Sequence, residues 1–142
     1  MRKINFKVVD GGVLPKKMKP LDVGLDCTAR RRVVENKYVE YYLGFCVEIP
    51  VGFVGLLFPR SSVSKTDLVM ANCVGVIDPG FNDEVRARFK TEKYDRMLEV
   101  YHTGDRVAQL IIVPVADFEV NVVDSFTTED RGGGFGTSDS QP

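Results

Sequence analysis

Strict alternation of apolar and charged side chains is the feature that most restricts how this chain can fold. Residues 84–90, EVRARFK, alternate at every position, and residues 117–122, DFEVNV, repeat the pattern. A strand with one buried and one solvated face needs a period of two, whereas an amphipathic helix needs about 3.6. Short apolar runs bounded by Gly, Pro, Asn and Asp turns recur elsewhere. The sequence therefore predicts an all-β fold of short antiparallel strands, built as a sandwich, jelly roll or barrel.

The length of 142 residues fits one domain with a single core. Residues 107–115 are apolar almost throughout, which predicts a strand covered on both faces. The one helix that the pattern allows is brief, around residues 64–70. Apolar residues almost vanish after about Thr127. We expect a β domain over residues 1–126 and a flexible, glycine-rich C-terminal lid over residues 127–142.

Charge and composition exclude several classes of function. The 19 basic and 20 acidic side chains leave a net charge of -1, so the chain lacks the positive field of a general nucleic-acid binder, despite the local cluster at residues 30–32. No apolar run is long enough for a signal peptide or a membrane span. The three cysteines form no C-x-x-C pair, and a single histidine excludes a His-rich metal site. We expect a cytoplasmic protein without stable nucleic-acid or membrane binding.

Two polar clusters of the N-terminal half follow or precede predicted strands. Residues 59–65, PRSSVSK, supply Arg60, Ser61 and Ser62 directly after a strand. A guanidinium, hydroxyl groups and a helix N-terminus are donors suited to phosphate oxygens. A helix cap beside a surface arginine explains the same residues equally well. Asp26, in the stretch VGLD, is by itself typical of a turn.

A third cluster, residues 72–81 (NCVGVIDPGF), has two short apolar runs around glycines and predicts a hairpin with accessible backbone groups. Asp78 follows Ile77 and precedes a Pro-Gly turn, so its carboxylate would have the rigid placement that a general base needs. An aspartate that merely starts a turn is the commoner alternative.

The last two clusters lie in the C-terminal third. Gln109 is a polar residue within an apolar strand, and a buried amide must be hydrogen-bonded to protein or to ligand. Asp105 and Arg106 form a candidate structural pair. Residues 131–136, RGGGFG, combine one arginine for phosphate, one aromatic ring for stacking and glycines that allow closure. They predict a nucleotide lid, with a disordered leftover as the alternative.

Together, and in this order, the five clusters resemble the trimeric dUTPase family (deoxyuridine triphosphate nucleotidohydrolases). The matching stretches are VGLDCTA, PRSSVSK, NCVGVIDPGFNDEV, GDRVAQLII and RGGGFGTS, within residues 16–138. The resemblance implies a distorted jelly-roll-like β-barrel and a homotrimer with three sites at subunit junctions, the tail arriving from the third chain. It also implies a dUTP diphosphatase that uses Mg²⁺ to hydrolyse dUTP to dUMP and pyrophosphate. Such an enzyme limits uracil incorporation into DNA and supplies dUMP for dTMP synthesis.

The resemblance also implies a role for each matching residue. Asp78 would activate the water that attacks the α-phosphate, and Asp26 would lie near Mg²⁺, in contact through water. The phosphate groups would meet Arg60, Ser61, Ser62, Gln109 and Arg131. The uracil and deoxyribose would be held by Asn72, Gly75, Val76, Ile77, Phe81 and Phe135, with Arg86 close to the substrate.

The chain departs from the family pattern at a few positions. Phe81 stands where the family usually has tyrosine and loses only the hydroxyl, so we expect sugar discrimination to survive. Asn82 and Asp83 replace a common Arg-Gly and add negative charge. The related dCTP deaminase is one alternative, although Arg88 stands where that enzyme carries its catalytic glutamate. A non-catalytic, nucleotide-dependent regulator is the other alternative, because such a trimer can keep all five motifs.

Overall fold

The computed structural model describes residues 3–91 and 100–135, and over these residues the chain is almost entirely β-structure. The prediction of an all-β fold is confirmed. The elements are β1 (Asn5–Val8), β2 (Leu25–Thr28), β3 (Arg31–Val34), β4 (Val39–Tyr42), β5 (Phe45–Glu48), β6 (Phe53–Pro59), the 3₁₀ helix η1 (Ser61–Lys65), β7 (Val69–Met70), β8 (Gly75–Ile77), β9 (Arg86–Lys90) and β10 (Arg106–Pro114).

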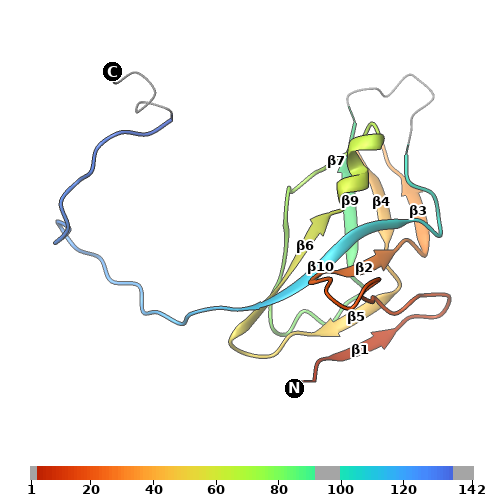
Figure 1. Cartoon of the computed structure of the whole chain (residues 1–142), viewed down its shortest axis with the longest axis horizontal. Coiled ribbons are helices and arrows are strands. Elements are labelled where there is room, and N and C mark those ends of the chain that lie inside the picture. Colours follow the sequence, from red (N-terminus) through yellow and green to blue (C-terminus); the bar gives the residue numbers. More distant parts are fainter. Residues whose placement is uncertain (1–2, 92–99, 136–142) are drawn as a thin grey trace.

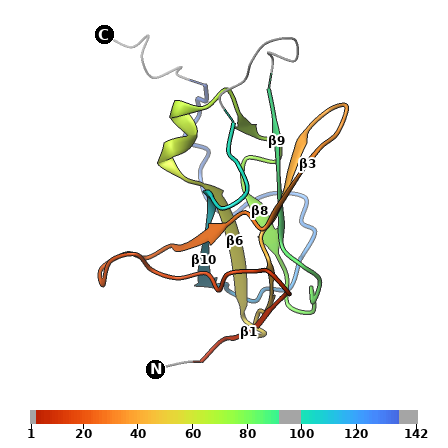
Figure 2. The ribbon, with the colours of Figure 1, turned by 90° about the vertical axis from the view of Figure 1, so that its right-hand side faces the viewer.

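Two four-stranded antiparallel sheets enclose the core, as Figures 1 and 2 show from two directions. One has the order β2-β10-β6-β8 and the other β3-β4-β9-β7, while β1 and β5 pair separately. Alternation in β9 works as predicted: Ala87 and Phe89 are buried, and Arg86, Arg88 and Lys90 are exposed. The largest fully buried side chains are Tyr41, Phe45, Phe89, Leu43, Leu57 and Leu110.

Two buried ionisable side chains of this core, Cys27 and Tyr41, stay neutral. Burial raises the pKa of the Cys27 thiol to about 12 and that of the Tyr41 hydroxyl also to about 12. Cys27 therefore packs as a small apolar side chain, and Tyr41 remains a hydrogen-bond donor at neutral pH. All three cysteines are free thiols, but only Cys27 is the buried small side chain that the sequence suggested for all three, since Cys46 is half-buried and Cys73 is exposed.

The helical segment lies a few residues before its predicted position. The sequence indicated a helix at residues 64–70, but the structure has a 3₁₀ helix at Ser61–Lys65, and Val69–Met70 pairs with β9. The Ser64 hydroxyl donates to Ser61 O, and the Thr66 hydroxyl donates to Val63 O. These local bonds, each spanning three residues, favour the tighter turn and satisfy carbonyls at the end of the helix.

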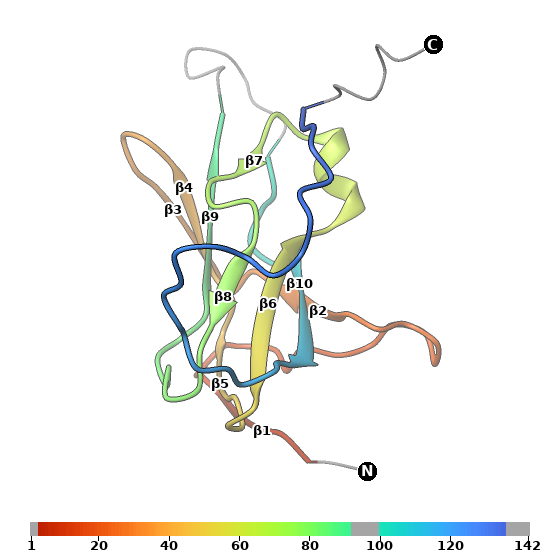
Figure 3. The same cartoon turned by 90° about the vertical axis from the view of Figure 1, so that its left-hand side faces the viewer.

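The strand predicted at residues 117–122 is wrong for this single chain. Residues 115–135 lie outside the strands and are exposed, with Phe118 79% and Val120 91% accessible. Figure 1 shows this segment leaving the folded body from the end of β10, and Figure 3 shows it from a second side. Among the described residues, no strand of the same copy pairs with this segment. Its alternating apolar side chains therefore form no buried strand face. The domain boundary near residue 127 stays a prediction, and residues 136–142 of the predicted lid lie outside the described residues.

Residues 72–81 do not form a simple hairpin between paired arms. β7, before them, pairs with β9, whereas β8, within them, pairs with β6 of the other sheet. The loop therefore crosses from one sheet to the other. In the described part of the chain, no helix is long and apolar enough to cross a membrane.

Candidate functional site

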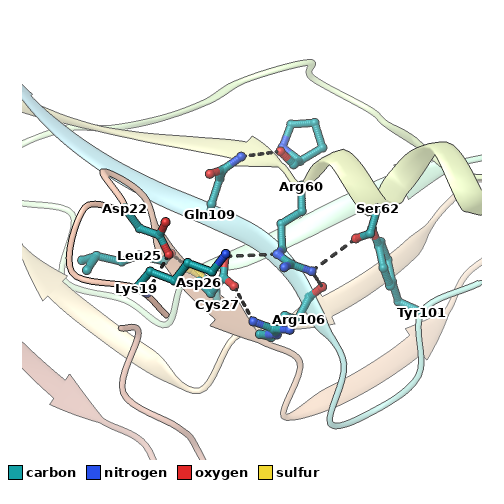
Figure 4. Close-up of polar contacts among 11 residues, drawn as sticks. Lys19, Asp22, Leu25, Asp26, Cys27, Arg60, Ser62, Tyr101, Arg106 and Gln109 are labelled. Carbon is teal, nitrogen blue, oxygen red and sulfur yellow. Dashed lines mark hydrogen bonds and ion pairs between the residues drawn. The ribbon is translucent and has the colours of Figure 1, made fainter. Parts of the chain in front are cut away.

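Strand β10 brings three of the five polar clusters together. It pairs with β2 on one edge and β6 on the other, which puts Gln109 opposite both Asp26 and Phe58. Strand β6 ends at Pro59, so Arg60 leaves the sheet beside this point. Residues distant in the sequence thus converge at one end of one sheet, as Figure 4 shows.

Asp26 forms ion pairs with two arginines. Arg60 Nε donates to Asp26 Oδ1 at 3.0 Å, and Arg106 Nη1 donates to Asp26 Oδ2 at 2.9 Å. The Asp26 side chain is 15% exposed, so solvent screens these pairs less than it screens a surface pair. Two guanidinium groups share one carboxylate, which leaves this cluster with a net positive charge. Such a cluster favours an anion.

The Arg60 guanidinium has further partners that fix its orientation. Its Nη1 donates to Ser62 Oγ at 3.3 Å and to Arg106 O at 3.2 Å. Ser62 Oγ also lies 2.8 Å from the Tyr101 hydroxyl. The cluster is therefore preorganised before any ligand arrives, as an electrostatic binding site requires.

Gln109 is held at the floor of the same site. Its Nε2 donates to Pro59 O at 3.1 Å. A Cβ atom placed on Gly24 would lie 2.6 Å from Gln109 Oε1, so glycine is needed there for the amide to approach. The structure thus decides one question that the sequence left open: the Gln109 amide is bonded to protein through Nε2.

These residues line an open pocket of about 450 Å³. Its polar lining includes Lys19, Asp22, Ser61 and Gln109, together with the Asp26 ion pairs. Three cations and two carboxylates face this space, which suits the polar, charged part of a ligand. Ser61 is exposed and lines this pocket, and its predicted contact with phosphate stays a prediction.

The third cluster lies at a different pocket. Asn72, Phe81 and Arg86 line a hollow of about 410 Å³ that shares no lining residue with the first pocket. Cys73 has a φ of 59°, and Val74 N donates to Asn72 O at 2.5 Å, which makes the loop very tight. This tight turn sits directly before the Gly75–Ile77 strand.

Asp78 is exposed and lies directly after β8. Phe81 N donates to Asp78 O at 3.2 Å, and Gly80 has a φ of 89°, so a closed turn fixes the backbone. Ile77 points into the core and Val76 is exposed. The placement that the sequence predicted for Asp78 is therefore present, but Asp78 is not among the residues that line the Asp26 pocket.

The comparison with known proteins decides the family. A dUTPase family profile matches residues 11–139. The chain belongs to the dUTPase family.

A curated relative, the deoxyuridine 5'-triphosphate nucleotidohydrolase of Pectobacterium carotovorum subsp. carotovorum (strain PC1), is 33% identical over 152 residues and covers 97% of each chain. Among solved structures, a mutant of the Staphylococcus bacteriophage 80alpha dUTPase with dUpNHpp matches at a TM-score of 0.79 and 25% identity, covering 97% of this chain and 99% of that one. A mutant dUTPase from phage phi11 of S. aureus, described with a structural Mg(II) ion, matches at a TM-score of 0.74 and 25% identity, covering 89% and 100%. The predicted jelly-roll-like fold is confirmed.

Two buried residues near the dUTPase motifs had not been singled out from the sequence. Glu40 is 5% exposed and accepts from Arg88 Nε at 2.8 Å, with Arg86 Nη1 at 3.8 Å. This contact raises the pKa of the Arg88 guanidinium above its ordinary value. A charged residue in the apolar run YVEYY was the available signal for Glu40. Tyr101, which touches Ser62, had no such signal, because only the fold brings these residues together.

The two predicted lid residues are described but have no site around them. Arg131 and Phe135 are exposed, and Phe135 has a left-handed φ of 46°. Within the described residues, neither lines one of the two pockets. Their predicted contacts with nucleotide therefore stay predictions.

Gly24→Ala should weaken anion binding at the Asp26 pocket. The added Cβ would push the Gln109 amide from its place, so we expect the Kd for inorganic triphosphate, measured by titration calorimetry, to rise by about tenfold. Leu21→Ala, at an exposed position of the same loop that does not line the pocket, is the control and should bind as the parent does. Unchanged affinity of Gly24→Ala would show that Gln109 is not part of the anion site.

Proposed function

We propose that this chain is a dUTP diphosphatase, which hydrolyses dUTP to dUMP and pyrophosphate. The observation that carries the proposal is the convergence of Asp26, Arg60 and Gln109 at one cationic pocket in a chain of the dUTPase family. The curated relative is named as an enzyme of this activity, and a structural relative binds the analogue dUpNHpp. By this reaction the protein would limit uracil incorporation into DNA and supply dUMP for dTMP synthesis.

A homotrimer is supported by the positions of Asp78 and Arg60 in the sheet. In the antiparallel register of β6 and β8, Ile77 lies opposite Gly55, whereas Arg60 follows Pro59 at the other end of β6. At about 3.4 Å per residue, Asp78 and Arg60 are roughly 20 Å apart along the strand direction. One copy therefore does not bring its own Asp78 to its own phosphate-binding residues. We propose that the Asp78 of one copy serves the Asp26 pocket of another, with the tail arriving from the third.

In this proposal the Asp78 carboxylate takes a proton from a water molecule that attacks the α-phosphorus. The bond from the α-phosphorus to the bridging oxygen breaks, and pyrophosphate leaves. Arg60, Ser61, Ser62 and Gln109 hold the phosphate oxygens and neutralise the charge that develops on them.

Mg²⁺ is proposed as the cofactor, held mostly by phosphate oxygens and water. Both oxygens of Asp26 accept from arginine, and no cluster of three or more acidic, His or Cys side chains occurs in residues 3–91 and 100–135. These residues fit Mg²⁺ with Asp26 acting through water and Asp22 nearby, because this ion retains several waters when it binds substrate phosphates. When bound, it would supply charge neutralisation on the phosphate chain.

The second pocket is proposed to take the deoxyuridine. Its narrow loop offers the backbone of Gly75, Val76 and Ile77 to the uracil, with Asn72 beside it. The exposed ring of Phe81 would lie under the deoxyribose, and Arg86 borders the same pocket. Phe135 would stack on the uracil, and Arg131 would meet the γ-phosphate when the tail closes. The Arg88–Glu40 pair occupies the position of the deaminase glutamate, which favours hydrolysis over deamination.

A substrate panel tests the activity itself. With Mg²⁺ present, we expect pyrophosphate release from dUTP and little from dCTP, dTTP or UTP. The narrow loop would exclude the thymine methyl group, its backbone groups would not match the amino group of cytosine, and the Phe81 ring would exclude the ribose hydroxyl. Ammonia is followed in the dCTP sample. Ammonia from dCTP would indicate a deaminase instead, and no reaction with any of the four would leave a nucleotide-dependent regulator.

Asp78→Asn should leave a folded protein that binds dUTP but barely hydrolyses it. The amide keeps the size of the side chain and its turn, but it cannot accept the proton from water, so we expect kcat to fall by at least about a hundredfold. Asp10→Asn, at an exposed N-terminal position, makes the same chemical change and should keep full activity. Near-parental turnover of Asp78→Asn would remove this residue from the role of base.

Deleting residues 131–142 should abolish turnover while changing the Tm little. The described part of this segment is exposed, so its loss removes no core packing. Steady-state hydrolysis of dUTP and a thermal melt measure the two effects on the same sample. A large drop in Tm would show that the segment has a structural role instead.

A further inference from the structure

Tyr101 connects the aromatic core to the Asp26 pocket. It is 7% exposed, and its ring packs edge-on against Tyr41, with centroids 6.3 Å apart, and against Phe89, with centroids 6.1 Å apart. The Tyr41 hydroxyl donates to Tyr101 O at 2.9 Å. Tyr41 and Phe89 belong to the β3-β4-β9-β7 sheet, so the rings of that sheet fix the ring of Tyr101.

Figure 4 shows the Tyr101 side chain beside Ser62, which lies in the first turn of η1. The Tyr101 hydroxyl lies 2.8 Å from Ser62 Oγ, which accepts from Arg60 Nη1 at 3.3 Å. Arg60 Nε donates in turn to Asp26. A continuous set of hydrogen bonds therefore runs from a rigid ring in the core to the guanidinium of the candidate phosphate site.

The direction of these bonds follows from what each group can do. A guanidinium only donates, so Ser62 Oγ is an acceptor toward Arg60. Either hydroxyl of this pair can be the donor. Because a phenol is more acidic than an aliphatic alcohol, it is the stronger donor, and we take Tyr101 as the donor to Ser62. The Ser62 oxygen then accepts two bonds, and its own hydrogen is left over for another acceptor.

Resting on the proposed function, we propose that Tyr101 is a positioning residue for binding of the nucleotide's phosphate chain. Its hydroxyl orients Ser62, which steadies Arg60 and turns the Ser62 hydrogen toward a phosphate oxygen. Ser62 and Tyr101 line an open hollow of about 380 Å³ together with Arg60, Lys65 and Arg106. Asp105 is the acidic residue of that lining, and its carboxylate already accepts from His102 N at 2.6 Å. The hollow therefore presents cations and a free hydroxyl hydrogen to an anion.

Tyr101→Phe tests the proposal, because it removes the hydroxyl and keeps the packed ring. We expect the KM for dUTP and the Kd for inorganic pyrophosphate to rise by about threefold to tenfold, with kcat changed less. Ser62→Ala should have an effect of similar size. In the Ser62→Ala background, Tyr101→Phe should add little, because both changes break the same set of hydrogen bonds.

Tyr41→Phe is the matched control. It makes the same chemical change in the same aromatic cluster, but its hydroxyl donates to a backbone carbonyl and not to Ser62. It should lower the Tm and leave the Kd for pyrophosphate unchanged. The proposal is overturned if Tyr101→Phe binds pyrophosphate with the Kd of the parent. It is also overturned if the Kd of the Tyr101→Phe, Ser62→Ala double variant rises by the product of the two single fold-changes, or if Tyr41→Phe raises the Kd as much as Tyr101→Phe does.

A second readout separates this proposal from the proposed function. The Nε–H signal of Arg60, assigned in ¹H–¹⁵N spectra with an Arg60→Lys variant, should shift or broaden in Tyr101→Phe and not in Tyr41→Phe. If the parent protein fails to hydrolyse dUTP, the proposed function is wrong, and the Arg60 signal still decides the role of Tyr101. If the parent hydrolyses dUTP and the signal is unmoved in Tyr101→Phe, the function stands and the positioning role is wrong.

Discussion

The candidate site depends on β10 pairing along both of its edges. Gln109 faces Asp26 on one side and Phe58 on the other, so two strand registers place the phosphate-binding side chains together. Val107, Ala108 and Leu110 are fully buried and hold that register. A slip by one residue would turn Leu110 to the solvent and Gln109 to the core, at the cost of exposed apolar area and an unpaired amide. The register of β10 therefore sets both the packing of the core and the geometry of the site.

Within residues 3–91 and 100–135, poorly exposed carboxylates hold arginine side chains at three places. Asp26 holds Arg60 and Arg106, Glu40 holds Arg88, and Glu84 holds Arg30 through two bonds of 3.1 and 2.8 Å. Each pair joins segments that are distant in the sequence. A lone arginine on a surface samples many rotamers, whereas a paired one has already lost that freedom before a ligand binds. Of these three clusters, the one at Asp26 has two hydrogen-bonded guanidinium groups for one acid, and it borders the pocket of about 450 Å³.

Much of this arrangement could be predicted from the sequence, for local reasons. The alternation in residues 84–90 predicted which side chains of β9 are buried, because the pleat of a strand is independent of its neighbours. Asp26, Arg60 and Gln109 could be singled out as polar residues at strand ends or within an apolar strand. Tyr101 and its partner Ser62 are 39 positions apart, and only the packing of two sheets brings them within 2.8 Å. The tight 3₁₀ turn likewise depends on hydroxyl bonds that a helical period does not reveal.

The strand predicted at residues 117–122 shows why a correct pattern can fail in one copy. Alternation of apolar and polar residues indicates that a strand would have one buried face. A strand also needs a neighbouring strand to pair with and a surface that covers its apolar face. Among the described residues of a single chain, residues 116–135 have neither, although Phe118, Val120 and Val122 keep the side chains of a buried face. The candidate site is likewise incomplete in one copy, because Asp78 and Arg60 lie beside opposite ends of β6. Both features become consistent if the folding unit and the catalytic unit are the assembly, so that the arm and the base each find their partners on another copy.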